Sequence, residues 1–230
     1  HGINTYGGAP SLVERLRKAG ATKPFVITEF GPLGAWEMPS TDWGAPIEQT
    51  SSQKAAYYRE CYEKAVVESE GQSLGSYAFL WGSKMEATST WFGMLLDDGA
   101  KLASVDVMSE IWTGKPPANL APAIEPIEID AGTVLKPGAT LMSRVSVEDP
   151  EGGDLTVKWV LRPESGDYHT AGAFRHAMPD IDGAVVESSG SKATIRMPDE
   201  PGQYRLFAYA YDDVGNAATA NIPLLVKHQR

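Results

Sequence analysis

The spacing of hydrophobic positions predicts that the first half of the chain alternates helices and buried strands. Apolar residues recur at helical spacing over residues 11–19, 53–66 and 104–112. Two short and almost continuous apolar runs, 24–28 and 75–82, lie between these segments. Such runs are typical of strands that are buried on both faces of a parallel sheet. The order helix–strand–helix–strand–helix predicts two consecutive units of a parallel α/β fold.

Polar residues at the helix ends support these assignments. Ser11 with Glu14, and Thr50 with Gln53, have the spacing of capping boxes, in which each side chain bonds the backbone amide of the other. Gly114 follows the last apolar position of the third segment and predicts its end.

The pattern changes at residues 115–122, a stretch rich in proline and alanine that predicts a stiff linker. Beyond it, helical spacing gives way to alternating apolar and polar positions at 141–147, 155–161, 193–197, 204–211 and 218–226. Clusters of turn residues separate these segments, which predicts an antiparallel β-sandwich. We therefore expect an α/β portion over 1–115, a linker over 116–122 and an all-β domain over 123–230.

The candidate chemistry lies in the run KPFVITEFG at residues 23–31. Glu29 stands where a buried parallel strand ends and a long loop begins. In a (β/α)8 barrel, this end of the strands forms the active-site face. Burying a carboxylate is costly unless it has partners or a function. On position alone, a glutamate capped by backbone amides at the edge of the core is an equally good interpretation.

This run resembles the seventh strand, which carries the nucleophile, of retaining β-glycosidases with (β/α)8 barrels, the clan that includes families 2 and 5. Residues 1–6, HGINTY, resemble the end of the sixth strand, and residues 76–82 resemble the eighth. Residues 90–99 resemble the closing segment of barrels in the family-2-like branch. The resemblance implies an α/β plus all-β chain: the last strands and helices of a (β/α)8 barrel, followed by an antiparallel Ig-like or PKD-like β-sandwich.

The resemblance implies that Glu29 is the nucleophile and that Tyr6 donates a hydrogen bond to it. It also places Trp81, at the end of the eighth strand, as the floor of a sugar subsite, because flat aromatic rings suit the C–H faces of a pyranose. Four further residues, from the flanking segments, are candidates for substrate binding: Trp36, Trp91, Asn4 and Glu86. For the tryptophans of the loops, local packing is an equally good interpretation, and Glu86 matches no acid/base position.

The second carboxyl group of the pair is missing. A retaining enzyme needs an acid/base about 5–5.5 Å from its nucleophile, and in this clan it follows an asparagine on the fourth strand. The chain contains no Asn-Glu dipeptide and no counterpart of strands one to five. We therefore expect it to be incomplete and inactive alone, with the N-terminal part of the same barrel as its partner.

Charge narrows the range of partners. The formal net charge is −10, without a basic stripe, which argues against nucleic acid and anionic membranes and allows a neutral oligo- or polysaccharide. No apolar run has the length of a membrane span. Cys61 is the only cysteine, so no internal disulfide can form, and the histidines lack ligand spacing, so no metal or cofactor is expected. The resemblance implies a secreted, periplasmic or cell-surface protein.

Two alternatives remain, a binding module and a calcium-binding cell-surface adhesin built on the β-domain, and a third signal is rejected. The chain could be a non-catalytic carbohydrate-binding or interaction module. The acidic turns at 149–154 and 212–216 could bind Ca²⁺, although ordinary turn chemistry explains them more simply. The run GQSLG at 71–75 matches the nucleophile elbow of serine hydrolases, but a helix precedes it and a strand follows, which is the wrong context. Trp159 is predicted to be a core residue of the sandwich.

Overall fold

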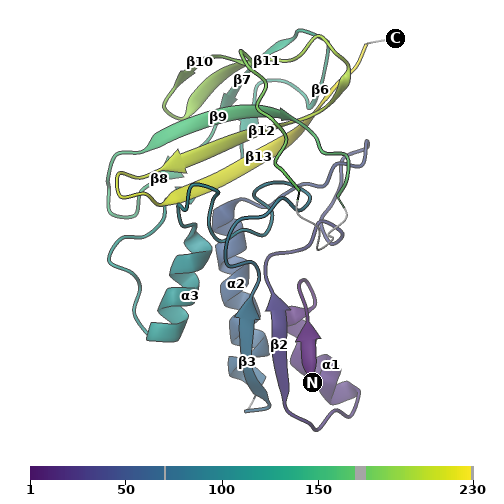
Figure 1. Ribbon diagram of the computed structural model, residues 1–230, viewed down its shortest axis with the longest axis vertical. Helices are drawn as coiled ribbons and strands as arrows, with labels where there is room; N and C mark the ends of the chain where they lie inside the picture. Colours follow the sequence, from purple (N-terminus) through teal and green to yellow (C-terminus); the bar gives the residue numbers. More distant parts are fainter. Residues whose placement is uncertain (70, 169–174, 229–230) are drawn as a thin grey trace.

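The computed structural model describes residues 1–69, 71–168 and 175–228. A small α/β unit forms one end of the molecule and a β-sandwich forms the other (Figure 1). The arrows of β2 and β3 point toward the sandwich, so the carboxyl ends of the parallel strands meet it. The helices and strands that define the α/β unit are β1 (Gly2–Asn4), η1 (Ala9–Ser11), α1 (Leu12–Lys18), β2 (Phe25–Phe30), α2 (Ser51–Ala65), η2 (Val67–Ser69), β3 (Ser73–Ala78) and α3 (Ala103–Thr113).

The strands of the α/β unit form one parallel sheet in the order β1-β2-β3, as two consecutive β–α units require. One of the two predicted capping boxes is present. Thr50 Oγ1 accepts from the Gln53 amide at 3.2 Å, and Gln53 Oε1 accepts from the Thr50 amide at 3.0 Å. The prediction for Ser11 is wrong. The 3₁₀ turn η1 comes directly before α1, and the Ser11 hydroxyl donates to the Gly8 carbonyl instead.

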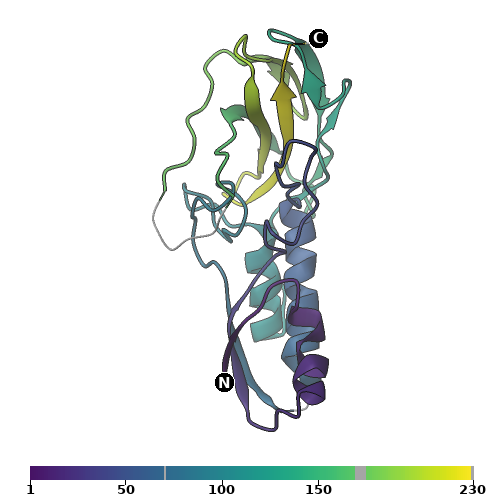
Figure 2. The ribbon, with the colours of Figure 1, turned by 90° about the vertical axis from the view of Figure 1, so that its right-hand side faces the viewer.

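Only one face of this sheet is covered. Phe25, Ile27 and Phe30 are buried against α2, and all three helices lie on that side of the sheet (Figure 2). On β3, Leu74 and Tyr77 are 69% and 67% exposed. The expectation of strands buried on both faces is therefore wrong for this chain, because no described segment packs against the second face. Three strands alone do not show a (β/α)8 barrel.

The predicted β-sandwich is confirmed by its strand pairing. One sheet has the order β10-β11-β7-β5 and the other β6-β13-β12-β9. Every pair is antiparallel except β6 with β13, which is parallel. The strands of the sandwich half are β4 (Ala123–Ile124), β5 (Glu128–Ile129), β6 (Val134–Leu135), β7 (Thr140–Arg144), β8 (Val147–Glu148), β9 (Thr156–Pro163), β10 (Val185–Ser189), β11 (Lys192–Arg196), β12 (Gly202–Tyr211) and β13 (Ala217–Val226).

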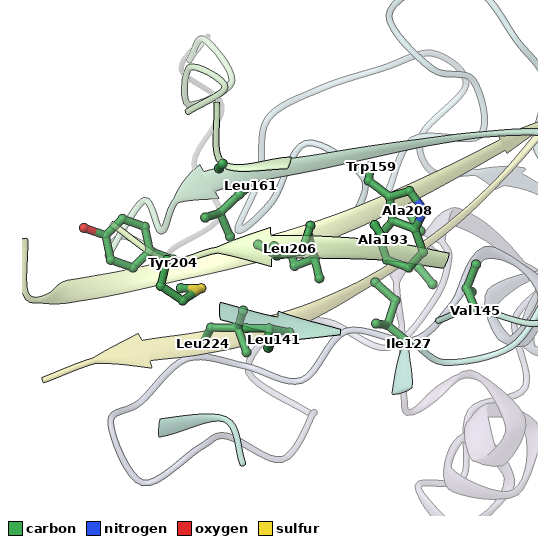
Figure 3. Close-up of a cluster of buried hydrophobic side chains, with 14 of the residues drawn as sticks. Ile127, Leu141, Val145, Trp159, Leu161, Ala193, Tyr204, Leu206, Ala208 and Leu224 are labelled. Atoms are coloured by element: carbon green, nitrogen blue, oxygen red, sulfur yellow. The ribbon is translucent and has the colours of Figure 1, made fainter. Parts of the chain in front are cut away.

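The core of the sandwich lies between its two sheets. Leu141 and Ala193 from one sheet meet Leu161, Leu206 and Leu224 from the other (Figure 3). Trp159 is 5% exposed within this cluster, so its predicted core role is confirmed. Alternation found the long strands, but β4, β5, β6 and β10 were missed because most of them are too short to show a period.

The two halves are packed together through a buried polar network. Lys54 of α2 lies 2.5 Å from Glu48, and both side chains are almost fully buried. The other carboxylate oxygen of Glu48 accepts from Asn221 of β13 at 2.7 Å and from the Thr88 hydroxyl at 2.6 Å. Burial opposes ionisation of Glu48, but the charges of Lys54 and Arg205 outweigh it and lower the pKa of Glu48.

The segment predicted to be a linker is held in place. The Ala121 amide donates to Asp106 of α3 at 2.6 Å, and the Asn119 carbonyl accepts from Lys101 at 3.1 Å. An apolar contact joins the halves beside it, where Leu102 packs in one cluster with Phe207 of β12. The sandwich is thus docked on the α/β unit.

Replacing Lys54 by methionine tests the junction. The Lys54→Met variant leaves Glu48 buried without its cation, and we expect a loss of about 3–5 kcal/mol in the free energy of unfolding. Lys18→Met is the matched control, because Lys18 pairs with Glu14 at the surface and its loss costs less than about 1 kcal/mol. Urea denaturation measures both. A loss below about 1 kcal/mol for Lys54→Met would contradict this account of the junction.

Candidate active site

Glu29 lies at the carboxyl end of β2, and Tyr6 follows β1. The Tyr6 hydroxyl donates to Glu29 Oε2 at 2.9 Å. The backbone brings the two side chains together, because Asn4 pairs with Glu29 at a bulge and the Thr5 amide donates to the Glu29 carbonyl at 2.9 Å. The contact anticipated between Tyr6 and Glu29 is therefore present, and the half-buried carboxylate has a side-chain donor.

The Tyr6 hydroxyl keeps its proton and acts as a hydrogen-bond donor. Partial burial raises the pKa of Tyr6, the hydrogen bond to Glu29 and the charge of Glu29 raise it further, and Glu86 adds a smaller contribution in the same direction. At neutral pH Tyr6 is protonated, so it can donate to an ionised carboxylate.

Glu37 fixes the backbone on either side of this contact. Its carboxylate accepts from the Gly7 amide at 3.0 and 2.9 Å and from the Gly34 amide at 2.8 Å. The next residue after Tyr6 is thereby tied to the loop that carries Trp36. Sequence reasoning missed Glu37, because a glutamate in a loop has no pattern that distinguishes a backbone clamp from a solvated side chain.

Aromatic rings surround Tyr6. The ring centroids of Trp36, Phe79 and Phe92 lie 5.6, 5.9 and 5.5 Å from the centroid of Tyr6. Trp36 is 57% exposed, so a large flat surface beside the Tyr6–Glu29 pair is open to a ligand. Phe79 comes directly after β3 and was not among the predicted site residues.

The three predicted tryptophans have different surroundings. The ring of Trp36 contacts that of Tyr6. Trp91 is 1% exposed and donates through Nε1 to the Leu33 carbonyl at 2.8 Å, so its ring is packed inside the chain. The ring of Trp81 lies 6.5 Å from that of Trp112 on α3. Of the two aromatic residues that follow β3, it is Phe79 and not Trp81 whose ring contacts Tyr6.

The two polar candidates also differ. Asn4 is exposed, accepts from the Thr28 hydroxyl at 2.5 Å and lies at the carboxyl end of β1, paired with Glu29. Glu86 is buried and forms an ion pair with Lys84. Lys84 was not predicted to belong to the site.

The glycine at position 31 permits the close contact between two strand ends. A Cβ atom there would lie 2.5 Å from the Phe79 carbonyl oxygen. The same carbonyl accepts from the Tyr58 hydroxyl, and the Phe79 amide donates to the Phe30 carbonyl at 2.7 Å. Any larger residue at position 31 would push Phe79 away from Tyr6.

The acidic turns of the sandwich follow turn chemistry. Asp149 Oδ1 accepts from the amides of Glu151 and Gly153, and Asp212 Oδ1 accepts from the amides of Val214 and Asn216. Within the described ranges, no group of three or more histidine, cysteine, aspartate or glutamate side chains is placed to hold a metal ion. The simpler interpretation of these turns is confirmed by their hydrogen bonds.

Comparison with known proteins finds likeness for half of the chain. The sequence matches no protein-family model and no curated protein. A PKD domain of an M14-like peptidase from Thermoplasmatales archaeon SCGC AB-540-F20 matches 48% of this chain and 100% of its own, at 17% identity and a TM-score of 0.31. The PKD1 domain of Vibrio anguillarum Epp matches 48% and 99%, at 16% identity and a TM-score of 0.29.

A third solved structure is the PmoD soluble domain from Methylocystis sp. ATCC 49242 (Rockwell), with 49% of this chain and 95% of that chain covered, 11% identity and a TM-score of 0.29. At these TM-scores the likeness carries no argument, and the sandwich is assigned from its own strand pairing. None of the helices in the described part of the chain has the length and apolarity to cross a lipid bilayer.

Alanine substitution separates a packing tryptophan from an exposed one. We expect Trp91→Ala to lower the free energy of unfolding by about 3–5 kcal/mol, because it leaves a cavity and an unpaired Leu33 carbonyl. Trp36→Ala should cost less than about 1 kcal/mol, since most of that side chain already contacts water. Thermal denaturation of both variants measures the difference. Equal losses would contradict the assignment.

Proposed function

We propose that the chain is the C-terminal part of a retaining β-glycosidase or transglycosylase that acts on a neutral β-linked glycan. The observation that supports this most strongly is the hydrogen bond from Tyr6 to Glu29 at the carboxyl end of a parallel strand. A nucleophilic carboxylate must be ionised, open on one side and held in one orientation. Glu29 is half-buried, has a tyrosine donor and is joined through the backbone to β1.

In the proposed reaction, Glu29 attacks the anomeric carbon of the sugar. A bond forms between a Glu29 oxygen and that carbon, and the bond to the leaving-group oxygen breaks as an acid donates a proton to it. Water or an acceptor hydroxyl then displaces Glu29, and the same acid, now a base, takes the proton. Tyr6 holds the carboxylate in place. The acid/base lies outside this chain.

The surroundings of Glu29 suit a pyranose. Trp36 and Phe79 present ring surface next to Tyr6, which suits the C–H faces of a sugar. The ion pair of Glu86 with Lys84 supplies both a hydrogen-bond acceptor and donors for hydroxyl groups. These opposite charges compensate each other, which agrees with a neutral ligand.

The proposed partner is the N-terminal part of the same barrel. β1 and β3 form the two edges of the sheet, and neither pairs with a further strand on its outer side among the described residues. The uncovered face carries Leu74 and Tyr77 as large exposed side chains. Further parallel strands at these edges would close the sheet, cover this face and bring a second carboxylate toward Glu29.

A second candidate function is carbohydrate binding without catalysis. The exposed ring of Trp36 favours it, because an exposed tryptophan beside polar groups can bind sugar whether or not a bond is broken. The two functions differ in the role of Glu29. It is indispensable to an enzyme and only one of several contacts in a binding module.

The Glu29→Gln substitution in the full-length parent tests the enzyme. We expect kcat on β-linked oligosaccharides to fall at least about 10³-fold, because the amide is a poor nucleophile of nearly the same shape. Glu14→Gln on the exposed face of α1 is the matched control and should leave kcat unchanged. Wild-type turnover by Glu29→Gln would rule out the assignment. Binding of the same oligosaccharides by both proteins without turnover would favour the binding module.

A further inference from the structure

The β-sandwich lies over the carboxyl ends of β2 and β3, where Glu29 is located (Figure 1). The loop after β3 passes between the sandwich and these strand ends, and it contains Glu86. The sandwich can therefore act on the candidate active site through this loop.

Three of the contacts that join the sandwich to this loop lie close to Glu86 in the chain. Arg162 of β9 donates to the Ser89 hydroxyl at 3.0 Å. The Ser165 hydroxyl, just beyond β9, donates to the Ala87 carbonyl at 3.3 Å. The Tyr168 side chain packs against the buried cluster that contains Ala87, in which Tyr6 and Phe79 also pack.

The turn at residues 86–88 needs such support. Ala87 has a φ of 59°, a left-handed conformation that side chains other than glycine rarely adopt. Backbone bonds link Glu86 and Thr88 in both directions, at 3.1 and 2.7 Å, and close the turn. A strained residue persists only where its surroundings hold it, and Ala87 is buried under Tyr168 and Ser165.

The chain next to Ser165 is firmly anchored to the sandwich. Glu164, next to Ser165, forms an ion pair with Arg205 of β12, and both side chains are almost fully buried. Arg205 also donates to the Pro46 carbonyl at 2.9 Å and to Asn221 of β13 at 2.6 Å. Burial raises the pKa of Tyr168, and the charge of Glu164 raises it further. The segment that contacts the turn at residues 86–88 is therefore fixed to the sheet that contains β12 and β13.

We propose that the β-sandwich positions the substrate-binding carboxylate of the candidate site: Tyr168 and Ser165 hold the turn at Ala87, and the turn holds Glu86 next to the cluster in which Tyr6 packs. This inference rests on the proposed function for the role of Glu86. Tyr168 and Ser165 are positioning residues and take no part in bond making. The sandwich is thus a component of the site and not only an appended module.

Hydrogen exchange in the chain itself tests the positioning step without any substrate. We expect Tyr168→Ala to speed exchange of the amides at Glu86 and Thr88 at least about tenfold at a fixed temperature. Tyr168→Phe keeps the ring and should restore slow exchange. Tyr211→Ala is the matched control, because Tyr211 also reaches from the sandwich to the same loop, through a 3.0 Å hydrogen bond to Asp98 instead of a contact with residues 86–88.

Kinetics of the full-length parent test the consequence. Loss of a group that binds substrate equally in the ground and transition states raises KM and leaves kcat unchanged. We expect Tyr168→Ala to raise KM about fivefold to tenfold with kcat within about twofold of wild type. Tyr168→Phe and Tyr211→Ala should match wild type.

The outcomes separate the two proposals. Unchanged exchange in Tyr168→Ala, or equal acceleration in Tyr211→Ala, would overturn the positioning role whatever the activity of the parent. Faster exchange with an unchanged KM would show that the turn is held but that Glu86 does not bind substrate, which also overturns the inference. Faster exchange in a parent without glycosidase activity would confirm the support of the turn and remove the proposed function.

Discussion

The buried carboxylate of Glu48 is the constraint on which the arrangement of the two halves depends. A buried charge is tolerated only when its partners are in place, and those of Glu48 come from three separate parts of the chain. Lys54 lies on α2, Thr88 and Thr90 on the loop after β3, and Asn221 on β13 of the sandwich. To satisfy this one group, the sandwich must dock on the strand ends and the loop must lie between them.

The site inherits its geometry from this docking. The loop that meets Glu48 through Thr88 also carries Glu86 two residues earlier. At its start, the Phe79 amide of this loop donates to the Phe30 carbonyl at the end of β2, the strand that carries Glu29. Glu29 and Tyr6 depend on shorter-range constraints, namely the pairing of β1 with β2 and the clamp of Glu37 on Gly7. One part of the candidate site is therefore held by the sheet and the other by the junction.

The sequence was informative where chemistry is local. The capping box of Thr50, the apolar run of β2 and the contact of Tyr6 with Glu29 follow from spacing or from a short resemblance, and the structure contains all three. Tryptophans could not be sorted in this way, because exposure is decided by distant segments. Trp36 is open to solvent and Trp91 is enclosed.

Residues whose role depends on tertiary contacts were missed for the same physical reason. Lys54, at a helical position, looks like a surface lysine until the sandwich covers it. Glu37, Phe79 and Tyr168 belong to loops, where periodicity carries no information.

The central claim concerns the carboxylate of Glu29, and the most direct test is to trap the covalent glycosyl-enzyme intermediate. The full-length parent is incubated with a 2-fluoro-glycoside, digested and analysed by mass spectrometry. The account predicts that the sugar is attached to Glu29, and attachment to any other residue would contradict it.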